Sequence, residues 1–497
     1  MNSQLARLQQ LANQAPEHPL LEDEHGPVCA AEILARVKEV ALQLQAMDIS
    51  RIGLFCDNSV DWVVADLACQ FEGICLVPVP TFFSDSQVRH VVDSAALEAL
   101  LYDRSTSSRV AFLFGAGKGV PLASARVLQC MALAPAKQTS MPAATAKLTF
   151  TSGSTGTPKG VCLSAPQCLR VAESLAKAVE LDSPRHLCVL PLSTLLENIG
   201  GIYMPLLCGG TSLVYSLESL GMSGSSGVQP DKFLGALERL QPETLILVPQ
   251  LLMLLDTALA QGWQAPGSLR FIAVGGGRVA PAVVARVRDA GLPVYEGYGL
   301  SESASVVSLN TPQADRPGTS GRVLPHVAVK QQGGELVVSG NTFLGYLDEP
   351  STWESDSVQT GDLGYISEDG YLTVQGRRKN VLVSSFGRNI SPEWVESELL
   401  AEVGIDQVVL VGDGRPYCAA LVYSRKDDES IARTLDKVNH MLPDYARILS
   451  WHRLQEPLSV ANGLLTDNGR LRRDAIAIAC EHEINSLYFE QVESFAL

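Results

Sequence analysis

From residue 51 onward, short apolar runs alternate with longer segments of helical length along most of the chain. The candidate buried strands span residues 51–56, 74–79, 97–102, 187–192, 244–248 and 271–274. Strands that are separated by helix-length segments predict parallel βαβ units, with helices on both faces of each sheet. Because 497 residues are too many for one hydrophobic core, we expect at least two domains.

A loop rich in hydroxyl groups and glycine follows the β-prone run at residues 147–150. It reads Thr151-Ser152-Gly153-Ser154-Thr155-Gly156-Thr157-Pro158-Lys159-Gly160. Glycines allow several backbone N–H groups to point at one anion, hydroxyls add donors, and Lys159 adds a mobile positive charge. The spacing differs from the Walker A pattern G-x-x-x-x-G-K-[ST]. We interpret the segment as a polyphosphate-binding loop and not as a flexible surface turn.

Two later segments have the composition of a nucleotide site. The strand at 271–274 is followed by three glycines, which let the backbone approach a flat ligand: Gly275, Gly276 and Gly277. Further on, the chain reads Val294-Tyr295-Glu296-Gly297-Tyr298-Gly299-Leu300-Ser301-Glu302. In this segment Tyr298 can stack on a base, Ser301 can bond phosphate oxygens, and Glu302 can hold Mg²⁺, a hard cation that prefers carboxylates.

A third segment reads Thr360-Gly361-Asp362-Leu363-Gly364-Tyr365. The Asp362 carboxylate can accept hydrogen bonds from both hydroxyl groups of a ribose. An isolated Gly-Asp turn would indicate only an ordinary turn acid, but beside the other segments we favour ribose binding. The fourth segment reads Gly376-Arg377-Arg378-Lys379. For Arg378 we expect no more than a solvated charge.

In this order, the four segments resemble the signature motifs of the acyl-adenylate-forming superfamily, and most closely those of fatty acyl-CoA ligases. The superfamily comprises acyl-CoA synthetases, stand-alone adenylation domains and luciferases. The resemblance covers essentially the whole chain. It implies an α/β fold: a large N-terminal domain of βα units with mixed sheets, residues 1–376, and a small α+β C-terminal domain on a hinge, residues 377–497.

The resemblance also implies roles for the residues of these segments. The loop binds the ATP phosphates with Lys159, the three glycines face adenine and part of the acyl pocket, and Arg377 contacts the ribose together with Asp362. Glu302 holds Mg²⁺, and Lys379 is the hinge of the small domain. The expected cofactors and substrates are ATP, Mg²⁺, a small carboxylic acid, and either coenzyme A or the phosphopantetheine of a carrier protein.

One residue departs from the superfamily pattern. The segment Asn468-Gly469-Arg470-Leu471 has arginine where members of the superfamily usually have a lysine that reaches the active site during adenylation. Arginine keeps the positive charge, but its guanidinium group is bulkier and planar, and it holds its N–H donors in a fixed arrangement. Removing one such donor can cost about 10²- to 10³-fold in rate. We expect Arg470 to function, because every other motif is intact.

The resemblance implies a two-step ligase. A carboxylate attacks the α-phosphate of ATP, and a thiol then displaces AMP to form a thioester. We favour CoA over a carrier protein because we see no insertion beyond the Ser- and Gly-rich stretch 219–229, which we expect to be a mobile surface loop. The alternatives are an enzyme that loads an acyl or peptidyl carrier protein, a catalytically silent nucleotide-binding protein, and a monooxygenase of the luciferase type.

The acid itself is less well defined by the sequence. Leu195, Leu196 and Glu197 occupy a position that helps line the acyl pocket in the resembling superfamily, where a histidine or an aromatic residue is common. The two leucines suggest a fatty or other apolar acid. We expect Glu197 to be a helix-capping carboxylate and not a pocket residue.

Composition excludes several other classes of protein. A net charge of −16 argues against nucleic-acid binding, which needs a basic surface. Eleven cysteines without C-x-x-C pairs indicate buried thiols in a reducing compartment, and eight histidines without H-E-x-x-H spacing argue against a transition metal held by the protein. The chain contains no run of eighteen apolar residues, which a membrane-spanning helix would need. Because the N-terminus also lacks an apolar signal core, we expect a cytoplasmic protein.

Overall fold

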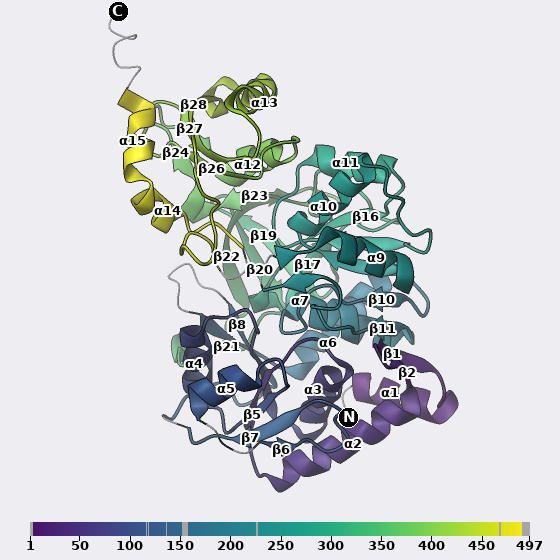
Figure 1. Cartoon of the computed structure of the whole chain (residues 1–497). Helices are drawn as coiled ribbons and strands as arrows, with labels where there is room; N and C mark the ends of the chain where they lie inside the picture. The colour runs from purple at the N-terminus through teal and green to yellow at the C-terminus, as the bar shows by residue number, and fades with distance from the viewer. Residues whose placement is uncertain are drawn as a thin grey trace, which may run out of the picture.

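The structure is a computed structural model that describes residues 3–115, 117, 119–135, 137–151, 158–224, 227–466 and 469–489. Figure 1 shows a large body, purple to green, with a smaller green-to-yellow body above it. This arrangement confirms the expected large α/β domain with mixed sheets and the smaller C-terminal domain. The position of the boundary, between residues 376 and 377, stays a prediction.

One of the two large sheets has eight strands in the order β21-β9-β8-β4-β3-β5-β7-β6. Its parallel strands are β4 (Cys75–Pro78), β3 (Arg51–Phe55), β5 (Ala99–Tyr102) and β8 (Lys147–Thr151). Antiparallel strands complete its edges: β9 (Lys159–Leu163), β21 (Gly345–Tyr346), β7 (Gln129–Ala132) and β6 (Val120–Pro121). The predicted strands at 51–56, 74–79 and 97–102 are therefore confirmed.

The other large sheet has nine strands in the order β18-β17-β16-β15-β14-β10-β11-β1-β2. Its parallel strands are β16 (Val294–Leu300), β15 (Phe271–Val274), β14 (Thr244–Leu247), β10 (Arg185–Leu187), β11 (Thr211–Leu213) and β1 (Pro19–Asp23). The antiparallel edge strands are β17 (Ser305–Leu309), β18 (Arg322–Val323) and β2 (Gly26–Cys29).

One strand of this sheet is misplaced in the sequence prediction. The sequence predicts a strand over the apolar run 187–192, but β10 (Arg185–Leu187) ends where that run begins, and the chain then leaves the sheet. Pro191 lies in that run and has no N–H group for a strand ladder.

Helices form three layers around the two sheets. The helices that share the apolar core between the sheets are α1 (Ser3–Gln14), α2 (Ala30–Ala46), α3 (Val60–Glu72), α6 (Ala165–Val179) and α8 (Met204–Cys208). The other face of the eight-stranded sheet is covered by α4 (Asp85–Ser94) and α5 (Ser107–Phe114). The other face of the nine-stranded sheet is covered by α9 (Pro230–Leu240), α10 (Pro249–Ala260) and α11 (Pro281–Asp289).

Local sequence signals begin and end several of these helices. Ser84 and Ser164 each cap a helix. Each exchanges hydrogen bonds with the glutamine three residues later, and this exchange satisfies two backbone N–H groups at the start of the helix. Gly73 ends α3 in the left-handed conformation, with φ of 72°. These signals fix where the chain enters and leaves the helices that separate the strands.

An antiparallel four-stranded sheet leads into the small domain. Its strands are β19 (Val327–Gln332), β20 (Glu335–Gly340), β22 (Ser357–Ile366) and β23 (Leu372–Arg377). The small domain contains η4 (Arg378–Asn380), β24 (Leu382–Val383), β25 (Asn389–Ile390), α12 (Pro392–Leu400), β26 (Gln407–Val411), β27 (Cys418–Tyr423), α13 (Asp428–Met441), β28 (Ile448–Arg453), α14 (Arg473–Ala479) and α15 (Glu481–Phe489). It has apolar clusters of its own.

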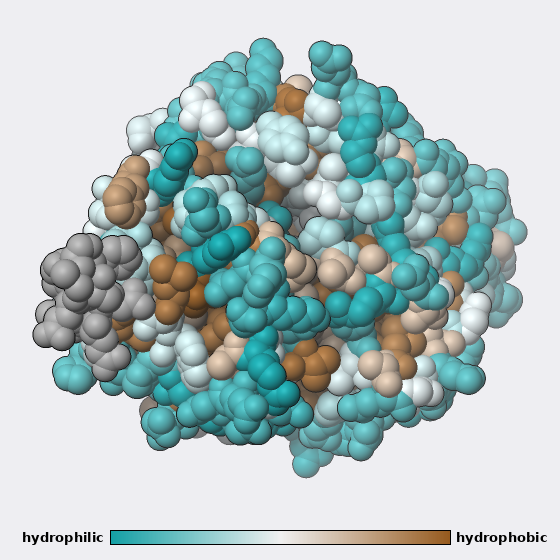
Figure 2. All heavy atoms as spheres, turned by 90° about the horizontal axis from the view of Figure 1, so that it is seen from above, coloured by the Kyte–Doolittle hydropathy of each residue, from teal (hydrophilic) through white to brown (hydrophobic). Residues whose placement is uncertain are grey.

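The stretch 219–229, which the sequence predicts as a loop, contains a short hairpin of β12 (Met222–Ser223) and β13 (Gly227–Val228). In the view from above, the surface is mostly hydrophilic and its apolar patches are small and separate (Figure 2). None of the helices in the described ranges is long and apolar enough to cross a membrane.

A buried polar network joins β8 of the eight-stranded sheet to α3 and to the π-helix η1 (Asn198–Tyr203). The Lys147 ammonium, on the first residue of β8, lies 3.0 Å from the carboxylate of Asp66 on α3. Tyr203, at the end of the π-helix η1 (Asn198–Tyr203), donates a hydrogen bond of 2.6 Å to the same carboxylate, and Asn198 donates another of 3.0 Å. Since the Lys147 and Asp66 side chains are 4% and 0% exposed, each charge depends on the other for compensation.

Replacing Lys147 by methionine should lower the stability of the large domain by about 3–5 kcal/mol, because an uncompensated carboxylate stays buried. The measurement is the shift in the urea midpoint of the large domain, followed by fluorescence. Lys177→Met, on the exposed surface of α6, is the matched control. Equal midpoints for the two variants would contradict this role for the network.

Candidate active site

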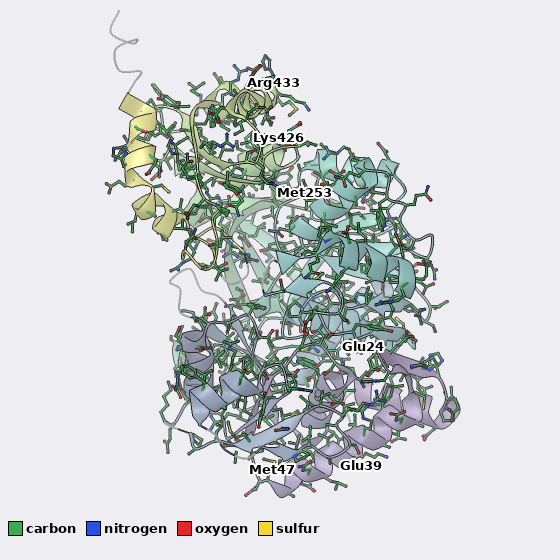
Figure 3. All side chains as sticks on the ribbon, viewed as in Figure 1. Glu24, Glu39, Met47, Met253, Lys426 and Arg433 are labelled. Atoms are coloured by element: carbon green, nitrogen blue, oxygen red, sulfur yellow. The ribbon has the colours of Figure 1, made fainter. Side chains whose placement is uncertain are left out.

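The large and small domains enclose a cleft of about 4040 Å³. Met253 of α10 and Lys426 of the small domain line it from its two sides (Figure 3). Every described residue that the sequence predicts for the site also lines it: Thr151, Lys159, Gly275, Gly276, Gly277, Tyr298, Gly299, Ser301, Glu302, Asp362, Arg377, Lys379 and Arg470. The predicted loop residues Ser152, Gly153, Ser154, Thr155 and Gly156 lie outside the described residues.

The two residues that flank the predicted phosphate-binding segment meet at one point of the cleft. Thr151, the last residue of β8, pairs in register with Lys159, the first residue of β9. The Lys159 ammonium lies 3.0 Å from the Glu349 carboxylate and 5.0 Å from the centre of the Tyr346 ring. The Tyr346 hydroxyl in turn donates a 2.7 Å hydrogen bond to Glu302. Tyr346 thus connects two predicted site residues that are far apart in sequence.

A tight turn after β16 places Ser301 and Glu302 at the cleft. Gly299 must be glycine there, because a Cβ atom would lie 1.9 Å from the carbonyl oxygen of Ser305. The turn continues through η2 (Ser301–Ser303) and two residues with positive φ, Ala304 at 54° and Ser305 at 98°. Backbone constraints therefore fix the direction in which the Glu302 carboxylate leaves the strand.

Asp362 is buried at the cleft and is already held by two side chains. Its Oδ1 lies 3.0 Å from Arg377 Nε, and its Oδ2 accepts a 2.6 Å hydrogen bond from the Tyr298 hydroxyl. Burial raises the pKa of Tyr298, and the neighbouring Asp362 raises it further, so the phenol keeps its proton and remains the donor. A carboxylate has about four acceptor positions, so two remain for a ligand.

Arg470 brings the small domain into contact with the three glycines. Its Nη2 donates a 3.0 Å hydrogen bond to the carbonyl oxygen of Gly276, a residue with φ of 80°. The side chain keeps solvent contact in the cleft. Even so, the surrounding protein atoms and the nearby Arg377 lower the pKa of Arg470, while Asp362 opposes this effect. Its charge therefore lies beside Arg377 and Asp362, although it comes from the other domain.

The chain passes into the small domain at a closely packed point. Gly376 has φ of 154°, and a Cβ atom there would lie 2.3 Å from the Ser391 hydroxyl. Lys379 follows in η4, where burial lowers its pKa and Arg377 lowers it further. The preceding Arg378 is half-exposed, but it is more than the solvated charge that the sequence suggests, because it pairs with Glu335 at 3.2 Å.

Glu296 is a cleft residue that the sequence interpretation missed. Burial raises its pKa to about 7, against the lowering effects of the Gly318 backbone and of Arg288 and Arg278. Its Oε2 has no hydrogen-bond partner among the described residues. Glu296 stands two residues before Tyr298 in β16, so the two-residue period of a strand would have placed both on one face.

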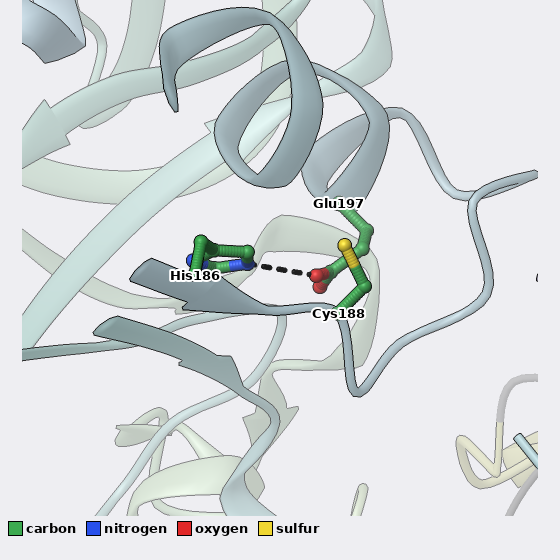
Figure 4. Close-up of side chains that lie close together, drawn as sticks. All are labelled: His186, Cys188 and Glu197. Carbon is green, nitrogen blue, oxygen red and sulfur yellow. Dashed lines mark hydrogen bonds and ion pairs between the residues drawn. The ribbon is translucent and has the colours of Figure 1, made fainter. Parts of the chain in front are cut away.

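Glu197 is neither the helix cap that the sequence favours nor a pocket residue. It is the last residue of α7 (Leu195–Glu197), it is fully buried, and its Oε1 lies 3.0 Å from His186 Nε2 in β10 (Figure 4). Leu195 and Leu196 do line the cleft. The short helix therefore presents its leucines to the cleft and its carboxylate to the interior of the domain.

The whole chain can now be placed in a family. The profile of the AMP-binding enzyme family matches residues 8–347, and that of the AMP-binding enzyme C-terminal domain matches residues 379–492. The chain belongs to the AMP-binding enzyme family. Residues 348–378, which include β22 and β23, lie between the two matches, and Lys379 begins the second.

Known relatives of the chain activate different acids. A long-chain-fatty-acid–CoA ligase of Mycobacterium bovis is 28% identical over 477 residues, which cover 80% of this chain and 77% of the relative. The fold is similar to that of an anthranilate CoA ligase in complex with anthranoyl-AMP (TM-score 0.80, 16% identity, 97% and 98% of the two chains). It is also similar to that of o-succinylbenzoate coenzyme A synthetase of Bacillus subtilis in complex with ATP and magnesium (TM-score 0.73, 23% identity, 94% and 98%).

If Asp362 holds the ribose of ATP, Asp362→Asn should raise the Kd for ATP by roughly 10- to 100-fold, because a hydrogen bond to a charged group contributes about 1.5–3 kcal/mol. Isothermal titration calorimetry measures this change. Asp369→Asn, at an exposed acid of the adjacent turn between β22 and β23, is the control. An unchanged Kd for the Asp362 variant would end the ribose assignment.

The raised pKa of Glu296 predicts a pH dependence of stability. Its pKa in the folded chain, about 7, lies above the ordinary 4.5, so folding favours the protonated acid. Its contribution to stability is therefore complete below pH 4.5 and is lost as the pH rises through about 7. Between pH 5 and pH 8, the melting temperature of the wild type should fall relative to that of Glu296→Gln. Parallel curves measured by differential scanning fluorimetry would contradict this prediction.

Proposed function

We propose that the protein is an ATP-dependent ligase that joins an apolar carboxylic acid to coenzyme A through an acyl-adenylate. The observation that carries the proposal is the meeting of Lys159, Glu302, Asp362 and Arg470 in one cleft, with Arg470 supplied by the other domain. The relatives that are named as acid–CoA ligases support the same reaction class.

In the first step, the substrate carboxylate attacks the α-phosphorus of ATP. A new carboxyl O–P bond forms, the bond to the bridging oxygen breaks, and pyrophosphate leaves. Lys159 stabilises the negative charge of the leaving phosphates, with the backbone donors of the loop that it follows. Asp362, held by Tyr298 and Arg377, binds the ribose and so fixes the α-phosphate relative to the acid.

The described residues fit a magnesium ion at Glu302. Its Oε1 accepts the hydrogen bond from Tyr346, and no described residue hydrogen-bonds its Oε2. A carboxylate oxygen that faces a phosphate-binding cleft is the type of ligand that Mg²⁺ prefers. When bound, the ion would neutralise phosphate charge. Tyr346 and the fixed turn after β16 hold the carboxylate in place.

Arg470 can supply the positive charge that the usual lysine supplies. Its hydrogen bond to Gly276 shows that the longer, planar side chain reaches the cleft. Two donors of a guanidinium can bind the carboxylate and phosphate oxygens in a fixed geometry. This contact favours an active enzyme over the catalytically silent nucleotide-binding protein, which Arg470 alone would suggest.

Apolar side chains of the large domain support an apolar acid. The cleft wall near the three glycines contains Leu195, Leu196, Leu234, Ile246, Val248 and Met253. An apolar wall stabilises an alkyl or aryl group by removing its surface from water. Both a fatty acid and an aryl acid could pack against this apolar wall, and an activity assay with both classes of acid distinguishes them.

In the second step, the small domain turns about Lys379 and a thiol attacks the acyl carbon. The new C–S bond forms, AMP leaves with the carbonyl–phosphate oxygen, and the thiol proton goes to solvent. Gly387 lies in the turn before β25, at the backbone edge that the resembling superfamily places beside the thiol path. We propose CoA as the thiol. Dependence on a carrier protein would be the alternative outcome.

The test is pyrophosphate release with MgATP for a panel of acids from acetate to long-chain fatty acids and benzoates, each with and without CoA. We expect release that depends on one class of apolar acid and accelerates with CoA. Release without stimulation by CoA would favour a carrier protein. ATP binding without release for any acid would overturn the ligase and favour the silent binder.

Lys159→Ala should reduce pyrophosphate release by about 10²- to 10³-fold, because it removes a donor to the developing charge. The rate is measured with saturating acid. Lys330→Ala, at an exposed position of β19, is the control. A rate equal to that of the control variant would remove Lys159 from the phosphate site.

Arg470→Ala should reduce the adenylation rate by a similar factor of about 10²- to 10³-fold, whereas Arg470→Lys should retain or raise it. Rapid-quench measurement of acyl-AMP isolates this step from thiol transfer. Arg433→Lys on α13, labelled in Figure 3, is the matched control. Full activity of the alanine variant would show that Arg470 does not act in adenylation.

A further inference from the structure

Three side chains that can ligate a metal meet in the interior of the large domain, away from the reaction groups. They are His186 of β10, Cys188 just after it, and Glu197 at the end of α7 (Figure 4). The three residues are 1%, 0% and 0% exposed, and a ring nitrogen of the histidine, Sγ of the cysteine and a carboxylate oxygen all lie within 4.8 Å of one another. Figure 4 shows the three side chains pointing toward one another from the strand and the short helix.

We propose that His186, Cys188 and Glu197 form a buried structural site for zinc or a similar thiophilic divalent cation. Neither the adenylation site nor the thiol path uses these residues, so the proposal is independent of the proposed ligase activity. Spacing alone did not predict it, because two ligands come from a strand end and the third lies nine residues beyond the cysteine.

The donor set and its dimensions match zinc. Zinc binds thiolate at about 2.3 Å, imidazole nitrogen at about 2.0–2.1 Å and carboxylate oxygen at about 2.0–2.2 Å. Around a tetrahedral ion, these bond lengths place the ligand atoms about 3.4–3.6 Å from one another. The observed 3.0 Å between His186 Nε2 and Glu197 Oε1 is slightly shorter than this separation, and ligand atoms as far apart as the 4.8 Å bound of the cluster would have to move closer together by about 1 Å.

One atom of the cluster lacks the partner that its burial demands. Glu197 Oε2 is buried and has no hydrogen-bond partner among the described residues. An unsatisfied carboxylate oxygen costs free energy in the interior, and a cation at this point would satisfy it. The His186 ring is also oriented for metal binding. Its Nδ1 lies 2.9 Å from the Thr244 hydroxyl, and this contact directs Nε2 toward the cluster.

Gly201 in the π-helix packs closely against the ligand atoms. A Cβ atom there would lie 2.8 Å from both Glu197 Oε1 and His186 Nε2, so any larger residue would compete for this volume. Its carbonyl oxygen accepts hydrogen bonds from the Cys188 thiol, at 3.8 Å, and from the Ser212 hydroxyl, at 2.6 Å. π-Helices are short, unfavourable insertions that occur frequently at functional sites.

A divalent cation would be balanced by its anionic ligands in the interior. Zinc binds cysteine as the thiolate and glutamate as the carboxylate, so one Zn²⁺ at this site would be matched by two negative ligands. The site would therefore avoid the large cost of an uncompensated buried charge.

Such an ion would fasten β10 to α7 and to the π-helix that follows. Leu195 and Leu196, on the same short helix as Glu197, line the cleft. Asn198 and Tyr203 of the π-helix belong to the buried Lys147–Asp66 network. The ion would thus support the cleft wall from the interior, without contact with the reacting atoms.

The test uses the full chain, expressed in zinc-supplemented medium and purified without metal-affinity resin. After dialysis against a weak chelator, elemental analysis should find about one zinc per chain, and Cys188→Ser and Glu197→Gln should each lower the content at least tenfold. Cys130→Ser, at a buried cysteine of β7, is the matched control and should keep its zinc. Removal of zinc should also lower the melting temperature of the wild type.

Cobalt substitution tests the same site without relying on a variant that folds. Co²⁺ added to the metal-free wild type should produce a thiolate-to-cobalt absorption band, and the Cys130 variant should show the same band. Wild-type protein with less than about 0.1 zinc per chain and no such band would overturn the proposal. Equal zinc in the wild type and the Cys188 variant would also overturn it. Neither result depends on ligase activity.

Discussion

The paired charges of Lys147 and Asp66 are the interaction on which the large domain most depends. The pair lies between two sheets that each have helices on both faces, where neither charge could remain without the other. Lys147 is also the first residue of β8, whose last residue, Thr151, lines the cleft. The same buried contact therefore anchors to α3 the strand that leads to the predicted phosphate-binding segment.

Some cleft residues are held by contacts within the large domain, whereas Arg470 is supplied by the small domain. Asp362 is fixed by Tyr298 and Arg377, and Glu302 is fixed by Tyr346 and by a turn that admits only glycine at position 299. Arg470 instead enters from the small domain, and its side chain donates a hydrogen bond to the backbone carbonyl of Gly276. If the small domain turns as proposed, Arg470 would be withdrawn while Asp362 and Glu302 keep their positions in the large domain.

Much of this arrangement could be predicted from the sequence because it depends on local pattern. The strand–helix alternation predicted the parallel centres of both sheets, and the four motifs predicted which residues line one cleft. The errors concern residues whose surroundings come from distant segments. The sequence suggests that Glu197 caps a helix, yet it faces His186 across the interior, and local sequence gives no sign of the burial that raises the pKa of Glu296.

The sequence by itself determined the family, the βα order of the large domain and the residue types of the site, because these depend on periodicity and on short motifs. Only the tertiary structure decided which side chains meet. It brought Arg470 to Gly276, Tyr346 between Lys159 and Glu302, and Cys188 to His186 and Glu197. Such contacts depend on how sheets, helices and domains pack, and no local spacing encodes the distance between elements that are remote in the chain.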